Sequence, residues 1–311
     1  MKKTLWICLT LALFTAFSAR ATDPQDPFRV VAPILEEEKP VPKDTSCGSP
    51  SRPFSVVVWP TIAPFGWVER IKRPNEQEII KPFGLFYNLF KDVAEHNNKV
   101  VYFVPTATLE KAEELTALKA ADILLGYYYD NTPYAKFQPL YPAVIQNPVV
   151  IITLKGKMPQ ERALENLIYK RGVMREDEKL YTLVHPMLPK KMKIDLVRSA
   201  KDAFQQLLSG DADFIITGRY SAEAELRRFK IKSLVDISEP IKNPSIFFAV
   251  AKDNPCRQEI QDFFKQYMEP IINDYDAMGD LLRGQLDIWQ DQFLYDPALK
   301  ATSDEADTNI N

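Results

Sequence analysis

The sequence predicts an α/β protein in which two lobes are joined by two crossing strands. The first observation is that a helical apolar stripe followed by a buried strand occurs twice, with the strands at 121–125 and 214–217. The second is that Asn-Pro and a run of β-branched or aromatic residues follow each unit, at 147–154 and 243–251. A residue before proline avoids the helical region, so each Asn-Pro begins an extended segment. We expect the strands at 149–154 and 246–251 to be adjacent and to form the only links between the lobes.

Length and composition agree with two domains. The chain has 311 residues, of which 46% are hydrophobic, and this is about the length of two domains. Ten glycines against 24 prolines disfavour glycine-rich nucleotide loops. The net charge is −3, without the clustered Lys and Arg that a nucleic-acid surface needs. We therefore expect no nucleic-acid partner.

Residues 1–21 are predicted to be a cleaved secretory signal. Lys2 and Lys3 precede an apolar stretch at 5–17, and Ala19-Arg20-Ala21 fits an A-x-A cleavage site. The alternative is an uncleaved membrane anchor, but the stretch is shorter than the roughly 20 residues that span a bilayer. Residues 22–53 hold seven prolines and an acidic run, which predicts a disordered linker. We expect cleavage near Ala21 and export of the mature chain.

Two cysteines remain outside the predicted signal, Cys47 and Cys256. In an oxidising compartment two cysteines can pair. A disulfide would hold their Cα atoms within roughly 7 Å of each other. The alternative is two unrelated thiols, and the sequence leaves both outcomes open.

The first lobe is expected at 54–146 plus 250–295. Its predicted strands are 54–59, 100–104 and 121–125, and Thr108 is a plausible helix N-cap. One apolar stripe at helical spacing predicts a core-facing helix: Phe83, Phe86, Tyr87, Phe90, Val93 and Ala94. The strand ends at Trp59 and Gly126 share one edge, where ligands bind in open α/β sheets.

The second lobe is expected at 147–249. A helix is predicted at 178–184, and a second helix begins after Ser199 and ends at Gly210. The strand at 214–217 is followed directly by Gly218-Arg219-Tyr220. Beyond the return crossing, apolar stripes at 260–267 and 278–289 predict two more helices. Residues 296–311 are polar and acidic and are expected to form a disordered tail.

These motifs together resemble the type II periplasmic solute-binding proteins of the polar amino-acid ABC-transporter class, solute-binding family 3. The resemblance covers 54 to about 267. It rests on the order and spacing of Pro64-Phe65, the helix motif at 82–89, Ala121-Asp122 to Gly126, Pro139-Leu140-Tyr141, and 199–213. It implies a two-lobed type II periplasmic-binding-protein fold with two crossing hinge strands that closes over a small solute. We expect a monomer without cofactor or metal, and an inner-membrane permease or sensor as partner.

The sequence lacks both of the charged residues with which this family binds an amino acid. The family's arginine after the Gly126-like position is absent from 127–136, and Gly218-Arg219 stands where an aspartate usually follows the second lobe's strand. A lysine does not replace a bidentate arginine without loss. We therefore expect common amino acids to bind poorly.

The candidate ligand-binding residues stand at strand ends or in the loops after them: Trp59, Phe65, Tyr127, Tyr128, Asp130, Arg175, Arg219 and Tyr220. Tyrosine offers a cleft apolar area with a polar tip, but residues 127–129 cannot all point the same way in an extended chain. Either Arg175 or Arg219 would take the place of the missing arginine that binds the ligand carboxylate. The alternatives are core packing for the aromatic residues, a solvated position for the arginines and a turn cap for Asp130.

Three functions remain open at this point: solute binding for uptake or sensing, a dehydratase-type lyase, and a scaffold that has lost its ligand. A lyase needs a positioned acid and a carboxylate-binding arginine, and only Arg175 with Glu176 or Asp177 offers them. His96 and His185 have no metal-ligand spacing. We expect a binding protein without catalytic residues.

Overall fold

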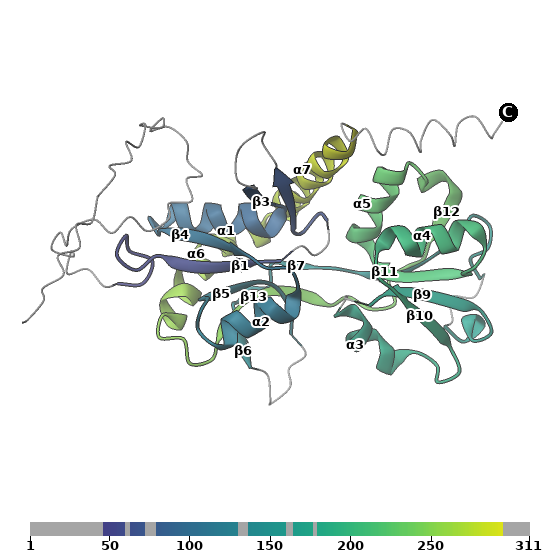
Figure 1. Cartoon of the computed structure of the whole chain (residues 1–311), viewed down its shortest axis with the longest axis horizontal. Helices are drawn as coiled ribbons and strands as arrows, with labels where there is room; N and C mark the ends of the chain where they lie inside the picture. Colours follow the sequence, from purple (N-terminus) through teal and green to yellow (C-terminus); the bar gives the residue numbers. More distant parts are fainter. Residues whose placement is uncertain are drawn as a thin grey trace, which may run out of the picture. The chain divides into compact units, whose positions relative to one another are not determined.

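The structure is a computed structural model, and it describes residues 46–59, 63–71, 79–129, 136–159, 164–176 and 179–294. These residues form two α/β lobes (Figure 1). The predicted signal, most of the predicted linker and the predicted tail lie outside the described ranges. Among the helices inside them, none combines the length and the apolar character that crossing a bilayer requires.

Lobe 1 is built on a six-stranded sheet in the order β4-β1-β5-β13-β6, with β7 also paired to β13. β4, β1 and β5 are parallel, and β13 is antiparallel to its neighbours. The bounds are β1 Phe54–Val58, β4 Val101–Pro105, β5 Ile123–Tyr128, β6 Phe137–Pro139, β7 Ile145–Gln146 and β13 Ser245–Ala251. A separate hairpin pairs β2 (Trp67–Ile71) with β3 (Ile79–Phe83).

Helices cover both faces of the lobe 1 sheet, because side chains alternate along each strand. Val56 and Val58 face one core cluster with α1 (Leu85–His96) and α6 (Arg257–Asn273), whereas Val57 faces another with α2 (Leu109–Ala117). The predicted N-cap of α2 is confirmed, since Thr108 Oγ1 accepts a hydrogen bond from the Lys111 N–H at 3.2 Å. α1 begins later than the apolar stripe suggests, because Phe83 belongs to β3.

Lobe 2 is built on a five-stranded sheet in the order β10-β9-β11-β8-β12. β10, β9 and β11 are parallel, and β8 is antiparallel to β11 and β12. The bounds are β8 Val149–Leu154, β9 Arg171–Arg175, β10 Lys193–Val197, β11 Phe214–Gly218 and β12 Val235–Ile237. One face packs against α4 (Ala200–Ser209) and α5 (Arg219–Phe229), and the other against α3 (Leu180–Val184).

The two crossings lie earlier in the chain than the expected strands. β8 and β13 belong to different sheets, so the prediction that 149–154 and 246–251 are adjacent linking strands is wrong in its residue ranges. The crossings are instead made where Asn147 N–H donates to the Pro244 carbonyl (2.9 Å) and Val149 N–H donates to the Lys242 carbonyl (2.8 Å). β13 therefore lies wholly in lobe 1, which moves the return boundary from 249–250 to 242–245.

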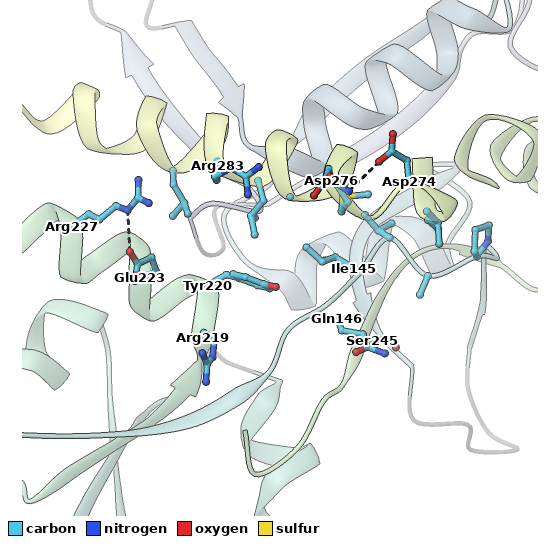
Figure 2. Close-up of a pocket in the computed structure, with 18 of the residues that line it drawn as sticks. Ile145, Gln146, Arg219, Tyr220, Glu223, Arg227, Ser245, Asp274, Asp276 and Arg283 are labelled. Carbon is cyan, nitrogen blue, oxygen red and sulfur yellow. Dashed lines mark hydrogen bonds and ion pairs between the residues drawn. The ribbon is translucent and has the colours of Figure 1, made fainter. Parts of the chain in front are cut away.

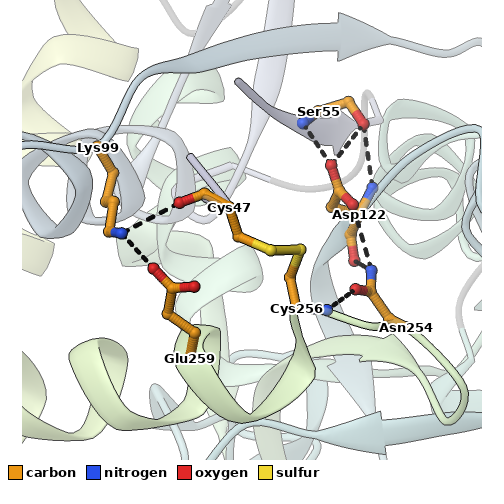
Figure 3. The surroundings of a disulfide bond; sticks show 7 residues. All are labelled: Cys47, Ser55, Lys99, Asp122, Asn254, Cys256 and Glu259. Carbon is orange, nitrogen blue, oxygen red and sulfur yellow. Dashed lines mark hydrogen bonds and ion pairs between the residues drawn. A yellow bond between two sulfur atoms is a disulfide. The ribbon is translucent and has the colours of Figure 1, made fainter. Parts of the chain in front are cut away.

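A disulfide joins Cys47 to Cys256, with their Cα atoms 5.9 Å apart (Figure 3). Cys256 immediately precedes α6, and Lys99 Nζ holds the Cys47 carbonyl at 3.0 Å and also pairs with Glu259. Residues 46–53 form turns against lobe 1. The disordered linker expected up to residue 53 is therefore wrong for these residues, because the crosslink fixes them.

The chain ends, in its described part, with two long helices on lobe 1. α6 is followed by α7 (Tyr275–Leu294), and the two helices match the predicted apolar stripes. α7 packs against α1 and α6 of lobe 1 and also contacts α5 of lobe 2. This contact brings a lobe 1 helix beside a lobe 2 helix.

Candidate ligand-binding site between the lobes

Both sheets direct the ends of their parallel strands toward the crossings. β13 starts at a crossing and is antiparallel to β5, with Ile246 opposite Tyr128, so β5 ends there. β8 starts at the other crossing and is antiparallel to β11, with Val149 opposite Gly218. The ends of β1, β5, β9 and β11 thus form one strand-end interface between the lobes. Ligands of open α/β sheets bind at such carboxyl ends.

One side chain spans the strand-end interface. Lys179, at the start of α3 in lobe 2, pairs with Glu113 on α2 of lobe 1. Its ammonium also lies 5.7 Å from the ring centroid of Tyr127, at the end of β5. Both members of the ion pair are partly shielded, with 35% and 24% of their side chains exposed. The lobes therefore touch across this interface through a charged pair and an aromatic ring.

Asn147 fixes the crossing itself. Its side chain is fully buried, and its amide Nδ2 donates to the Tyr128 hydroxyl at 2.9 Å. It also fills the space beside Gly218, where an added Cβ would lie 2.2 Å from Nδ2. Gly218 ends β11 and precedes α5. A single amide therefore contacts the end of a lobe 1 strand and the end of a lobe 2 strand.

The predicted aromatic residues of lobe 1 are mostly core. Phe65 is 2% exposed and stacks on Phe86 at 5.2 Å, and Tyr127 is 7% exposed and packs edge-on to Phe137. Trp59 is half-buried, and its indole N–H donates to the Leu125 carbonyl at 2.8 Å. Tyr128 points away from the Tyr127 cluster and contacts the cores of both lobes. The alternation expected at 127–129 is therefore present.

A second contact between the lobes lies along α5 and α7. Ala224 of α5 is buried in a cluster with Trp67, Leu286 and Trp289 of lobe 1. Arg227 of α5 donates to Asp287 of α7 at 2.8 Å. The edge of the Phe65 ring meets the Tyr220 ring at a centroid distance of 6.2 Å, which adds a further contact between the lobes.

A cavity of about 1080 Å³ lies between these contacts and the crossings (Figure 2). α5 supplies its lobe 2 wall and α7 its lobe 1 wall, and Ile145, Gln146 and Ser245 of the crossing strands line it as well. Two predicted site residues, Arg219 and Tyr220, are consecutive in the lobe 2 wall. The cavity is distinct from the Lys179 contact, whose residues do not line it.

Charges line both walls of this cavity. On the lobe 2 wall, Glu223 accepts hydrogen bonds from Arg227 (3.2 Å) and Lys232 (2.8 Å). Burial raises the pKa of Glu223, but the hydrogen bonds and charges of Lys232 and Arg227 outweigh it, so the pKa lies below its ordinary value. Arg219 donates from Nη2 to the Ser238 carbonyl at 3.1 Å. On the lobe 1 wall, Asp274 accepts from the Asp276 and Ala277 N–H groups.

Arg175 does not line the large cavity. Its side chain borders a cavity of about 20 Å³ inside lobe 2, together with Ser221 and Glu225 of α5. Burial raises the pKa of Glu225 above its ordinary value, against the lowering effect of Arg228 and Arg175. A space of this size holds a water molecule but no larger solute.

Apart from Trp59 and Phe65, which pack within lobe 1, the structure separates the predicted site residues that it describes into three places. Tyr127 and Tyr128 lie at the strand-end interface, Arg219 and Tyr220 line the large cavity, and Arg175 lies inside lobe 2. Asp130 falls outside the described residues. Sequence reasoning missed Glu113 and Lys179, because nothing in their local pattern shows that α2 and α3 face each other. The Asn-Pro pattern predicts only that a crossing begins at Asn147 and does not reveal the contacts of its side chain with Tyr128 and Gly218.

The chain matches no protein-family model and no curated protein. Among solved structures it is similar to the GluR0 ligand-binding core in complex with L-glutamate, with TM-score 0.59 and 12% identity over 76% of this chain and 100% of that one. It is also similar to an amino acid ABC transporter substrate-binding protein from Streptococcus pneumoniae bound to L-arginine, with TM-score 0.57 and 15% identity over 76% and 95%. A third similar structure is an ancestral amino acid-binding protein, a precursor of cyclohexadienyl dehydratase, with TM-score 0.57 and 19% identity over 75% and 94%. These similarities show that the chain has the two-lobed type II periplasmic-binding-protein fold.

Proposed function

We propose that the chain binds a small solute between its two lobes, at the strand-end interface, and serves uptake or sensing. The observation that supports this most directly is Lys179, which reaches from lobe 2 to Glu113 and Tyr127 of lobe 1. Such a contact forms only when the lobes are close together. The similar solved structures, named for L-glutamate and L-arginine complexes, support the same use of the fold.

The proposed solute has an apolar or aromatic face and at most one acidic group. Tyr128 supplies half-buried aromatic area at the interface, beside the largely buried Tyr127, and Lys179 supplies a cation that is already partly balanced by Glu113. Burying an unpaired charge costs several kcal/mol in practice. The arginine and aspartate that would hold the two charges of an amino acid are absent from their usual places in the sequence. We therefore propose that ordinary amino acids bind poorly.

The setting of this function follows from the predicted signal at 1–21. We propose a mature, monomeric periplasmic protein that hands its solute to an inner-membrane permease or presents itself to a membrane sensor. Co-purification with a solute, identified by mass spectrometry of periplasmic protein, would identify the ligand.

Thermal unfolding with a panel of amino acids, aromatic acids and neutral aromatic solutes tests the binding. A solute at a hundred times its dissociation constant stabilises the folded chain by about 2.7 kcal/mol. Lys179→Met is expected to weaken binding of the active solute, because the pair across the interface is lost. Lys111→Met is the matched control, since it removes a Lys–Glu pair confined to α2, Lys111 with Glu114 at 2.8 Å.

Two results would refute this proposal. One is that polar amino acids stabilise the chain while aromatic solutes do not. The other is that Lys179→Met and Lys111→Met bind the active solute equally well. If no solute in the panel shifts the midpoint for the parent chain, the scaffold hypothesis replaces solute binding.

The described residues do not favour the lyase hypothesis. Arg175 borders the water-sized cavity with Glu225, Glu176 is exposed at the surface, and Asp177 lies outside the described residues. A carboxylate-binding arginine and a positioned acid have to face the same substrate. We therefore propose a binding protein, and incubation of the pure protein with aromatic-acid precursors is expected to show no turnover.

A further inference from the structure

The large cavity between α5 and α7 lies apart from the proposed solute site. Its walls come from different lobes, and residues of the crossing segments line it between those walls (Figure 2). Neither Tyr127, Tyr128 nor Lys179 lines it. Its volume of about 1080 Å³ is slightly above the usual range for small-molecule sites, about 300–1,000 Å³. A molecule bound here would leave the strand-end interface open.

The cavity has an apolar lining of the kind that binds hydrocarbon. The apolar and aromatic residues that line it include Ile145, Tyr220, Ile237, Met278, Leu282 and Leu286. They come from both lobes and from the segment before the first crossing. Ligand pockets combine such a lining with a few polar groups that fix orientation.

The lobe 2 wall adds an excess of positive charge. Arg219, Arg227 and Lys232 line it against a single carboxylate, Glu223. Arg227 and Lys232 both bond to that carboxylate, and Arg227 also bonds to Asp287. The Arg219 side chain has no carboxylate partner within the described ranges, where its one hydrogen bond runs to the Ser238 carbonyl and its buried Nε has no partner. Buried polar groups in folded proteins are nearly always paired. We therefore expect the guanidinium of Arg219 to bind an anionic oxygen of a ligand.

We propose that this cavity is a second binding site, for an amphipathic anion with an apolar body and one carboxylate. The apolar body would lie against Ile145, Tyr220 and Leu282, and the carboxylate would reach Arg219. A charge-assisted hydrogen bond from a guanidinium gives such a carboxylate its orientation.

Calorimetry with decanoate as probe, on the purified chain with its disulfide intact, tests the proposal. We expect saturable binding of decanoate. Decanol has the same hydrocarbon chain without the charge. We expect it to bind at least about tenfold more weakly, because it loses a hydrogen bond between charged groups. Acetate has the charge without the chain, and we expect no binding at the same concentrations.

Two pairs of variants localise the probe. Arg219→Gln removes the proposed anion partner and should weaken decanoate binding about tenfold or more. Lys230→Gln is the control, because it removes an exposed cation at the end of the same helix and should leave decanoate binding unchanged. Gly279→Phe places a ring in the cavity from α7 and should abolish binding. Gly284→Phe, five residues further along α7 and facing open space, is its control.

Absence of saturable decanoate binding to the parent chain would overturn the proposal. Binding that survives Gly279→Phe would overturn it too, because the probe would then lie elsewhere. Equal affinity for decanoate and decanol would exclude the anionic group. None of these measurements involves the solute of the strand-end interface, so this site and the proposed function can fail separately.

Discussion

Two glutamates on one helix have their ionisation shifted in opposite directions. Glu223 lines the large cavity, where Lys232 and Arg227 overcome the effect of burial and lower its pKa. Glu225 faces the interior of lobe 2, where burial dominates and raises its pKa. The two side chains are only two residues apart on α5. Their surroundings therefore set their acidity, and the sequence around them does not.

These shifts predict opposite pH dependences for two glutamine variants. For Glu225, whose folded pKa is raised above 4.5, the stability advantage of the parent over Glu225→Gln should decline as pH rises through that raised pKa. For Glu223, whose folded pKa is lowered below 4.5, the advantage over Glu223→Gln should be full above that pH and decline as pH falls. Denaturant unfolding across acidic to neutral pH measures both, and slopes of the same sign would contradict the assignment.

At the scale of elements, the crossing depends on the fit between Asn147 and the end of β11. Gly218 has φ −70° and ψ 138°, a conformation open to any residue. Space is therefore the only constraint, and the Asn147 amide occupies the place where a Cβ would be. The same amide donates to the Tyr128 hydroxyl of lobe 1.

A double-mutant cycle follows from this fit. Gly218→Ala is expected to destabilise the parent chain by about 1–3 kcal/mol, the usual range for overpacking. In the Asn147→Ala background the added methyl has room, so the same substitution should destabilise less, with a coupling of at least about 0.5 kcal/mol. Gly284→Ala is the control, because it meets nothing within 4 Å and should stabilise α7 by about 0.5–1 kcal/mol. Additive effects at 147 and 218 would show that the two residues are not in contact.

Elements with strong periodicity were predictable, and those defined by pairing were not. The apolar strands β1, β5, β8, β11 and β13 and the capped helices α2 and α4 agree with expectation because burial and caps leave local signals. β9 has only two consecutive apolar residues, Val173 and Met174, after Gly172, and β10 is a largely exposed edge strand, so neither shows a long apolar run in the sequence. The crossings were misplaced because an apolar strand looks the same on either side of a boundary.

The candidate site was less predictable than the fold. Strand ends located the interface, and Tyr127 and Tyr128 do lie there. Lys179 and Glu113 are 66 residues apart in sequence, and only the packing of two lobes brings them together. The sequence does not fix which cavity Arg175 borders, because a strand end indicates the edge where a side chain lies and not the direction in which it turns.

At the scale of the whole molecule, the lobes touch on both sides of the crossings. Lys179 and Glu113 form one contact, and α5 with α7 forms the other, with Ala224 buried between aromatic rings. A rotation about the crossings that separates one contact presses on the other. The angle between the lobes is therefore held by packing as well as by the two covalent links.

The disulfide is expected to stabilise the whole molecule. It closes a loop with a sequence separation of 209 residues, and restricting the unfolded chain in this way typically adds about 2–4 kcal/mol. Cys47→Ser with Cys256→Ser should lower the free energy of unfolding by that amount in denaturant titrations. Parent protein kept in reductant should match the variant, and an unchanged midpoint in both would contradict the expectation.

The same crosslink also decides how the molecule would respond to mechanical load. Every strand from β1 to β13 lies between Cys47 and Cys256. Tension applied between a point before Cys47 and a point after α7 would pass through the sulfur atoms and the last two helices, and neither sheet would be stretched. The 209 residues inside the disulfide loop would not extend. Their fully extended length is about 700 Å, at 3.3–3.6 Å per residue. Reduction of the disulfide would allow this length to extend. The total extension of a single molecule under force would therefore show whether its disulfide is oxidised or reduced.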